Sequence, residues 1–307
     1  MTDSTSTTPV LAIGEILWDI LPSEKLLGGA PANFCHRLRQ LGLDARMVSR
    51  VGEDNLGTEL LAGLKALHFD LSLIQVDKEH PTGTVDVVLS EDGNPTFTIN
   101  TGVAYDFLEA SPKLLEAAQV ASLFCFGTLV QRSQKTRETL YKIIESAPQA
   151  TKFLDINLRR DCYTAETVSE SLRRADILKL NTSEVTIISD LLDLGATSPQ
   201  ELARKVIKEF DVHTVLVTLG ERGVYAIDAL GHACTVPGIS VQVADTIGSG
   251  DSFAAGFVFK YLQGAPLEEC CYFGNLIGAL NATKKGGMPD ISRADLEAFL
   301  GKHQQAA

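Results

Sequence analysis

Residues 245–257 read DTIGSGDSFAAGF and place a carboxylate directly behind a glycine-rich turn. Apolar residues recur at helical spacing after Asp251 until Gly264, so the turn leads into a helix. The free N–H groups and the positive dipole end of a helix N-terminus attract anions. A carboxylate inside such a cradle suits phosphoryl transfer, in which backbone dipoles hold the developing charge while the acid accepts a hydroxyl proton. Taken alone, G-x-G-D is equally consistent with a plain turn whose acid pairs with the helix dipole.

Other phosphate-binding and catalytic motifs do not occur in the sequence. There is no G-x-x-x-x-G-K-[ST] loop, and Gly256 comes too late to complete a dinucleotide fingerprint. Neither H-E-x-x-H nor the H-R-D loop of protein kinases is present. These observations count against a nucleotide-dependent oxidoreductase, which an alternating α/β pattern alone would allow.

The composition limits the partners that the chain can have. Its 39 acidic and 27 basic residues give a formal charge of -12, which disfavours nucleic acid and anionic lipid. The longest apolar runs, at 120–126 and 214–219, are too short to span a bilayer, and no signal peptide precedes them. The six cysteines contain no C-x-x-C pair and suggest reduced thiols. We therefore expect a cytoplasmic protein with a disordered polar tail at 1–8.

Strand-like and helical segments alternate along most of the chain. VLAIGEIL reads as a strand before the helical PANFCHRLRQLG, and VQVADT reads as a strand-like approach to the glycine turn. The alternation predicts an α/β fold in which helices cover both faces of a parallel sheet. Functional sites in such sheets lie beyond the carboxyl ends of the strands. No linker-like boundary interrupts the pattern, so we expect residues 1–307 to form a single domain.

One segment breaks this alternation. Residues 82–100, TGTVDVVLSEDGNPTFTIN, contain two alternating runs joined by the turn signal EDGN, which predicts a β-hairpin. No helical segment accompanies it. A hairpin inserted into an α/β chain often serves as a lid or a subunit contact, and we expect this one to close over the substrate and exclude water.

Two long motifs resemble the signatures of the ribokinase-like (PfkB) carbohydrate kinases. DTIGSGDSFAAGF is similar to their D-T-x-G-A-G-D-x-F-x-A-G signature, and residues 28–57 resemble their N-terminal signature. The resemblance runs from about Val10 to Leu300. It implies a doubly wound, mostly parallel sheet with helices on both faces, and a small β lid formed by about 15–30 and 82–105.

The resemblance also implies the residues that transfer the phosphoryl group. Asp251 would be the base for the sugar hydroxyl, and Gly248, Ser249 and Gly250 would form the anion hole. Ser249 stands where alanine is common in the family. We expect the surrounding N–H groups to lower the pKa of Asp251 and keep it ionised.

On the nucleotide side, the resemblance implies ATP as the phosphoryl donor and Mg²⁺ as its metal. NTSE matches the family's N-x-x-E, with Asn181 and Glu184 organising Mg²⁺ through water, although an N-capped helix start would give the same pattern. TLGERG, with Thr218 and Gly220, matches the nucleotide-phosphate loop but could be a plain turn. Asn275 would complete the ATP site.

Sugar-binding residues are expected from the N-terminal half. Asp19, Gly28, Gly29 and Asn33 correspond to family positions that hydrogen-bond sugar hydroxyls, and carboxylates and amides offer the directional donors and acceptors that a neutral polyol needs. Arg159 in DINLR would face anionic oxygens of the nucleotide or product. Without the family, these residues would be read as a solvated loop acid, an early-helix amide and an exposed strand-end arginine.

The resemblance further implies K⁺ as an activating ion beside the anion hole. The expected donors, mostly backbone carbonyls, are Asp245, Ile247, Asn281, Lys284 and Gly286. Such an ion would orient the glycine turn.

The combination of GEILWD, GGAPANF and DINLR indicates the fructokinase branch of the family. D-fructose is accordingly the expected substrate, followed by 2-keto-3-deoxygluconate, another hexose or a pentose. A catalytically silent sugar-binding regulator is the alternative, disfavoured because the acid, the glycine turn and N-x-x-E are all present. A homodimer through the β lid is a further expectation.

Overall fold

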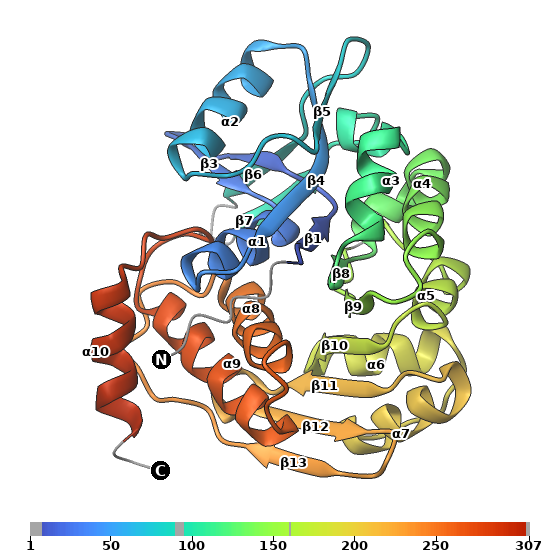
Figure 1. Ribbon diagram of the computed structural model, residues 1–307, viewed down its shortest axis with the longest axis vertical. Coiled ribbons are helices and arrows are strands. Elements are labelled where there is room, and N and C mark those ends of the chain that lie inside the picture. The colour runs from blue at the N-terminus through green and yellow to red at the C-terminus, as the bar shows by residue number, and fades with distance from the viewer. Residues whose placement is uncertain (1–7, 90–94, 160, 305–307) are drawn as a thin grey trace.

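The computed structural model describes residues 8–89, 95–159 and 161–304, which form two sheets with helices packed around the larger one (Figure 1). In the larger sheet, parallel pairing extends from β5 to β11, and β12 and β13 add an antiparallel edge. The order of the strands is β13 (Ala233–Val236), β12 (Val224–Asp228), β11 (Thr214–Thr218), β10 (Ile177–Asn181), β9 (Thr151–Asp155), β8 (Leu123–Phe126), β1 (Val10–Ile13), β4 (Ala45–Gly52) and β5 (Ile74–Asp77).

Helices cover both faces of this sheet, because its central strands are apolar on both sides. In β8, Leu123 belongs to one hydrophobic core and Phe124 to the other. The first core lies under α1 (Ala30–Gln40), α2 (Asn55–Ala66), α8 (Ser249–Tyr261) and α9 (Leu267–Ala282). The second lies under α3 (Pro112–Gln119), α4 (Gln134–Glu145), α5 (Ala165–Leu172), α6 (Thr182–Leu191) and α7 (Pro199–Phe210). The prediction of a doubly wound α/β sheet is confirmed.

The helices that carry the candidate site are fixed by an aromatic cluster. Phe153 of β9 contacts Phe34 of α1 and Phe257 of α8, with ring centroids 6.2 Å apart in each pair. All three side chains are buried, and each stabilises the fold by about 1.5–3 kcal/mol through burial. This packing holds α1 and α8 side by side. The C-terminal α10 (Arg293–Gln304) packs on α9.

The smaller sheet contains the hairpin predicted at 82–100. Its order is β3 (Lys25–Gly28), β2 (Leu17–Ile20), β6 (Thr84–Leu89) and β7 (Pro95–Ile99). The hairpin strands pair in antiparallel fashion, and β2 pairs with β6 in parallel. The segments 15–30 and 82–105 therefore meet as expected. The EDGN turn and nearly all of the tail expected at 1–8 lie outside the described residues.

Two predicted strands are wrong. VLAIGEIL is divided at Gly14 into β1 and β2, which belong to different sheets. A Cβ atom at Gly14 would lie 2.6 Å from Pro31 Cγ, so the chain turns there close to α1. VQVADT is not a strand, because the N–H groups of Ala244 and Asp245 donate to the Ala282 carbonyl at the end of α9 and not to a neighbouring strand.

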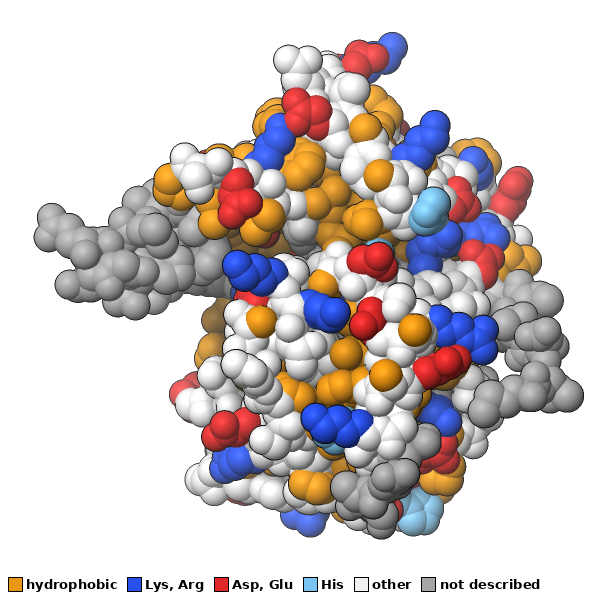
Figure 2. All heavy atoms as spheres, turned by 90° about the vertical axis from the view of Figure 1, so that its left-hand side faces the viewer, with side chains coloured by type: hydrophobic (Ala, Val, Ile, Leu, Met, Phe, Trp, Pro, Cys, Tyr) orange, Lys and Arg blue, Asp and Glu red, His pale blue; other side chains and the backbone are white. Residues whose placement is uncertain are grey.

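Charged side chains of both signs are interspersed over the face shown in Figure 2, and hydrophobic side chains gather in its upper part. Among the helices of the described segments, none has both the length and the apolar character needed to cross a membrane.

Candidate active site

The predicted helix after the glycine turn begins at Ser249, and its N-cap is Gly248. Gly248 has φ 72°, and a Cβ atom there would lie 2.7 Å from the backbone of Gly287. Glycine is therefore required both by the left-handed conformation and by the close approach of the 287 loop. The helix geometry leaves the N–H groups of Gly250 and Asp251 without intrahelical acceptors. The turn thus leaves N–H donors free at the start of α8, where the sequence predicts an anion hole.

Asp251 lies in the first turn of α8 and joins this turn to α1. Its Oδ2 accepts a hydrogen bond of 2.7 Å from Asn33 Nδ2. Among the described residues, Asn33 Oδ1 is buried and has no hydrogen-bond partner. Asn33 therefore orients the carboxylate with one end of its amide, while the oxygen at the other end lies buried beside Gly287.

The expectation of a lowered pKa for Asp251 is wrong. Burial raises its pKa from 3.8 to about 6, and the nearby Asp155 carboxylate raises it further, while Lys179, Asn33 and Arg159 act in the opposite direction. The helix N-terminus and the glycine N–H groups do not outweigh the loss of water around the carboxylate. A carboxyl group with this pKa is ionised at neutral pH and yet remains an effective proton acceptor.

A buried ion pair under the glycine turn was not predicted. Lys179 of β10 lies opposite Asp155 of β9 across the parallel pairing, with Nζ 2.7 and 2.9 Å from the two carboxylate oxygens. A Cβ atom on Gly250 would lie 3.5 Å from Lys179 Nζ, so the ammonium group lies directly beside the turn. The available signal was a lone lysine in the apolar strand ILKLN. The pair places a positive charge close to the expected position of the transferred phosphoryl group.

The nucleotide-side residues meet at the carboxyl ends of neighbouring strands. Asn181, which ends β10, lies opposite Thr218, which ends β11. Thr218 Oγ1 donates to the Leu180 carbonyl at 3.3 Å, and Gly220 follows with φ 64°. Asn275 of α9 donates from Nδ2 to the carbonyls of Val236 and Pro237, at 3.2 and 3.0 Å. Asn275 thus lies by the segment that follows β13, and its side chain shapes that edge of the site.

Asn181 and Glu184 form a capping box at the start of α6. The Asn181 side chain accepts from the Ser183 and Glu184 N–H groups, and the two Glu184 carboxylate oxygens accept from the N–H groups of Asn181 and Leu158, each at 2.8 Å. Burial raises the pKa of Glu184. The capping interpretation of NTSE is therefore correct, but it leaves each oxygen with a lone pair for another donor.

These residues suit Mg²⁺ only through water. In the described part of the chain, no group of three or more His, Cys, Asp or Glu side chains could hold a metal ion. Mg²⁺ retains several waters when it binds nucleotide phosphates. Glu184 lies in the first turn of α6, just after β10, and its carboxylate keeps lone pairs that could accept hydrogen bonds from such waters.

Asp19, Gly28 and Gly29, expected on the sugar side, lie where β2 and β3 pair, next to the start of α1. A Cβ atom on Gly28 would lie 2.5 Å from Asp19 Oδ2, and one on Gly29 would lie 2.5 Å from the Glu15 carbonyl. Burial raises the pKa of Asp19, and the Arg159 charge lowers it. Arg159 is itself exposed and also acts electrostatically on Asp251. The structure thus brings the two glycines and Asp19 together, on the side of Asp251 that faces α1.

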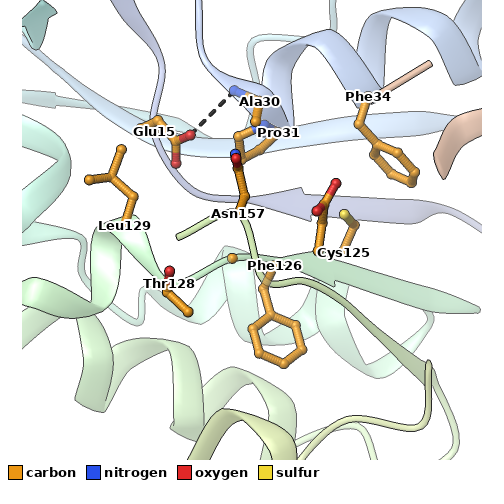
Figure 3. Close-up of a pocket in the computed structure, with 11 residues that line it drawn as sticks. Glu15, Ala30, Pro31, Phe34, Cys125, Phe126, Thr128, Leu129 and Asn157 are labelled. Carbon is orange, nitrogen blue, oxygen red and sulfur yellow. Dashed lines mark hydrogen bonds between the residues drawn. The ribbon is translucent and has the colours of Figure 1, made fainter. Parts of the chain in front are cut away.

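Glu15 is a candidate site residue that sequence reasoning missed. It is buried, and its Oε1 accepts from the Ala30 N–H at 3.2 Å, which satisfies a free donor at the start of α1 (Figure 3). Burial raises its pKa to about 7, with Arg159 acting in the opposite direction. It lines a small pocket together with Thr128 and Asn157. The signal was available in GEILWD, four residues before Asp19.

The segments expected to hold K⁺ come together. Asp245 accepts from the Ile247 N–H at 3.0 Å and from the Gly286 N–H at 2.9 Å. The Ile247 carbonyl accepts from Asn281 Nδ2 at 2.9 Å, and the Asn281 carbonyl accepts from the Lys284 N–H at 2.9 Å. Carbonyl oxygens have two lone pairs, so these bonds leave capacity for a cation. The donor set is compatible with a monovalent ion.

Comparison with known proteins agrees with this arrangement. The model of the pfkB family carbohydrate kinases matches residues 23–294. Fructokinase-1 of Oryza sativa subsp. japonica is 29% identical, and the alignment covers 92% of this chain and 94% of that protein.

Solved structures are similar over nearly the whole length. Fructokinase from Xylella fastidiosa with bound ATP has a TM-score of 0.84 at 21% identity, covering 96% of this chain and 99% of that one. Fructokinase from Vibrio cholerae O395 with fructose, ADP and calcium has a TM-score of 0.81 at 26% identity, covering 96% and 99%. The fold is the ribokinase-like α/β fold, and the chain belongs to the pfkB family of carbohydrate kinases and is a sugar phosphotransferase.

Proposed function

We propose that the enzyme transfers the γ-phosphoryl group of ATP to a primary hydroxyl of D-fructose. The observation that carries this proposal is the hydrogen bond of 2.7 Å between Asn33 and Asp251. It joins the sugar-side helix α1 to the glycine turn of α8, so one carboxylate lies between the expected sugar and the expected phosphates. The relatives known as fructokinases support this choice of sugar.

In the proposed reaction, the sugar hydroxyl lies against Asp251, which accepts its proton as the new O–P bond forms. The N–H groups of the glycine turn stabilise the charge on the transferred group, and Lys179 adds a fixed positive charge beside them. Asn33 holds the base in place. Mg²⁺, bound by the ATP phosphates and by water at Glu184, would neutralise phosphate charge. Positioning and electrostatics supply most of the acceleration in such reactions.

The charge of the sugar side favours a neutral acceptor. The charge of Arg159 acts on three carboxyl groups, those of Glu15, Asp19 and Asp251, while Lys179 also acts on Asp251 and is paired with Asp155. A phosphorylated sugar or a sugar acid would add negative charge to this set, whereas the hydroxyls of a neutral hexose can donate to the carboxylates. We therefore place D-fructose before 2-keto-3-deoxygluconate. A silent sugar-binding regulator is disfavoured, since Asp251, the glycine turn, Asn181 and Glu184 are all present.

A coupled assay of ADP release tests this proposal. The enzyme is incubated with ATP, Mg²⁺ and K⁺ and with each of a panel of free sugars, sugar acids and sugar phosphates. We expect the highest kcat/KM on D-fructose and a phosphate ester on a terminal carbon of the product, located by NMR. A kcat/KM on 2-keto-3-deoxygluconate far above that on fructose would overturn the assignment of D-fructose as the substrate. Binding of sugar with no turnover at all would indicate the regulator.

The smaller sheet is proposed as a lid. Asp19 lies on β2, which pairs with β6 of the hairpin, so movement of the hairpin is transmitted directly to a sugar-binding residue. Closure would exclude water from the phosphoryl group. Replacing 84–99 by a short Gly-Ser linker should lower sugar turnover and raise ATP hydrolysis in the absence of sugar. If sugar turnover and ATP hydrolysis without sugar both stayed unchanged, the smaller sheet would not act as a lid.

We also propose that K⁺ activates the enzyme, that two chains form a homodimer through the smaller sheet, and that the protein is cytoplasmic. The meeting of the 245–247 and 281–286 segments supports the ion. All six cysteines are free, which is compatible with a reducing compartment.

A further inference from the structure

A buried arginine lies behind the glycine turn and takes no part in the proposed phosphoryl transfer. Arg37 of α1 is 2% exposed. Across residues 8–89, 95–159 and 161–304, no carboxylate forms an ion pair with it; Asp290 influences its charge only through space. Burial lowers its pKa to about 10, so it remains protonated at neutral pH. A buried charge without an ionic partner is costly, and its burial is tolerated only where other polar groups accept its hydrogen bonds.

The acceptors of Arg37 are neutral oxygens, and three of them belong to the segments that surround the glycine turn. Nη2 donates to Asn281 Oδ1 at 2.8 Å and to the Pro289 carbonyl at 3.5 Å, and Nε donates to Ser252 Oγ at 3.3 Å. A further bond, from Nη1, reaches Gln40 on its own helix. The guanidinium group therefore connects α1 with the first turn of α8, the end of α9 and the loop after it.

These bonds determine the orientation of the Asn281 side chain. Its Oδ1 accepts from both Arg37 and Ser252 Oγ, at 2.8 and 3.0 Å. The opposite end, Nδ2, then has to face the Ile247 carbonyl, to which it donates at 2.9 Å. A guanidinium group can only donate, so it excludes the flipped amide. A hydroxyl alone could donate to the amide oxygen or accept from the amide nitrogen, and would allow either orientation. Arg37 thus fixes the peptide that immediately precedes Gly248.

We propose that Arg37 is a positioning residue for phosphoryl transfer, which holds the anion-hole turn in its working geometry through Asn281 and Ser252. It touches neither substrate. Its effect is on the direction of the N–H groups that follow Ile247, and a small misplacement of such groups lowers the rate of the chemical step much more than it lowers binding. The inference rests on the proposed function of the glycine turn.

The test compares Arg37→Met with Arg39→Met. Arg39 is on the same helix, but it donates to the carbonyls of Ala45 and His68, away from α8. On whichever sugar the wild type turns over fastest, we expect Arg37→Met to lose kcat by about 10- to 100-fold, with KM values for ATP and sugar within about threefold. Arg39→Met should stay within about twofold of the wild type in all three constants.

A second readout does not depend on turnover. Hydrogen–deuterium exchange followed by mass spectrometry should show faster exchange of the peptide covering 245–252 in Arg37→Met, with other peptides unchanged. A double-mutant cycle with Asn281→Leu should show that the second substitution adds little to the first, because both break one relay. If Arg37→Met does not fold, Asn281→Leu and Ser252→Ala carry the same comparison with the guanidinium group in place.

Failure of the inference and failure of the proposed function look different. Wild-type kcat and unchanged exchange at 245–252 in Arg37→Met would overturn the positioning role. Faster exchange throughout the chain would also overturn it, since Arg37 would then only stabilise the fold. A wild type that turns over no sugar would remove the proposed function, while the exchange comparison would still decide the role of Arg37.

Discussion

Replacing Asp251 by Asn should stabilise the protein while it abolishes most of the activity. Burial raises the pKa of Asp251 from 3.8 to about 6 in the folded protein. Each pKa unit corresponds to 1.36 kcal/mol, so ionised Asp251 costs the folded state about 3 kcal/mol relative to the unfolded chain. The residue is partly accessible to solvent, which makes this figure an upper limit. Asn keeps the shape, can still accept from Asn33, and carries no charge to bury.

The sign of the pH dependence follows from the raised pKa. The folded protein holds the Asp251 proton more tightly than the unfolded chain, so stability falls as pH rises from 3.8 to about 6 and the cost is complete above that pH. Asp251→Asn should therefore gain up to about 3 kcal/mol at pH 8 and about half as much at pH 5. Its kcat should fall by ~10²–10⁴, with ATP and sugar binding nearly unchanged.

Urea unfolding at pH 5 and pH 8, together with kcat at pH 8, checks both parts. Asp190→Asn is the matched control, because Asp190 is exposed on α6 and its substitution should change stability by about 0.5 kcal/mol or less. A variant that is no more stable than the wild type at pH 8, or that differs from it equally at both pH values, would refute the pKa argument. Full kcat in Asp251→Asn would show that the acid only pairs with the helix dipole.

Three further outcomes are expected at the same site. The pH profile of kcat/KM should have an acid limb near pH 6 from Asp251. Lys179→Met should move that limb upward by roughly 1–3 pH units, because the ammonium group lowers the pKa of Asp251. An unmoved limb would assign the titration to another group. Gly248→Ala should lose kcat by about 10²-fold or more, because the residue has φ 72° and the added Cβ would lie 2.7 Å from the Gly287 backbone. Gly264→Ala is the control, since Gly264 also has a positive φ but nothing lies within 4 Å of its added Cβ. Turnover rates in K⁺ should exceed those in Na⁺ or in a bulky organic cation. Equal rates in all three would refute activation by K⁺.

Local features of the site could be predicted from the sequence because they depend on neighbouring residues. The glycine turn before α8, the hairpin at 82–100 and the N-cap of α6 are each determined by residue types within a few positions. The carboxyl ends of β10 and β11 could also be paired in advance, since adjacent parallel strands present their last residues at one edge. Asn181 and Thr218 are register partners at that edge.

Features that depend on distant packing could not be predicted. Lys179 meets Asp155 only because β10 and β9 are in register, and Arg37 finds three of its four acceptors more than 200 residues away. The predicted direction of the Asp251 pKa shift is wrong for the same reason. Helix-dipole effects are local and can be read from a motif, whereas burial requires knowledge of what covers the carboxylate.

The separation of Asn33 from Asp251, 218 residues along the chain, also restricts when the site can exist during synthesis. At about 5–20 residues per second, α1 leaves the ribosome roughly 10–40 s before the turn that it contacts. For roughly the first half of that interval β1 waits for β8, one of its two sheet partners. Throughout the interval, the surface of α1 that will pack on α8 is uncovered. The nascent N-terminal half therefore carries the sugar-side residues without a base. A ribosome stalled before residue 245 should hold a chain that exposes this apolar surface to chaperones and has no kinase activity.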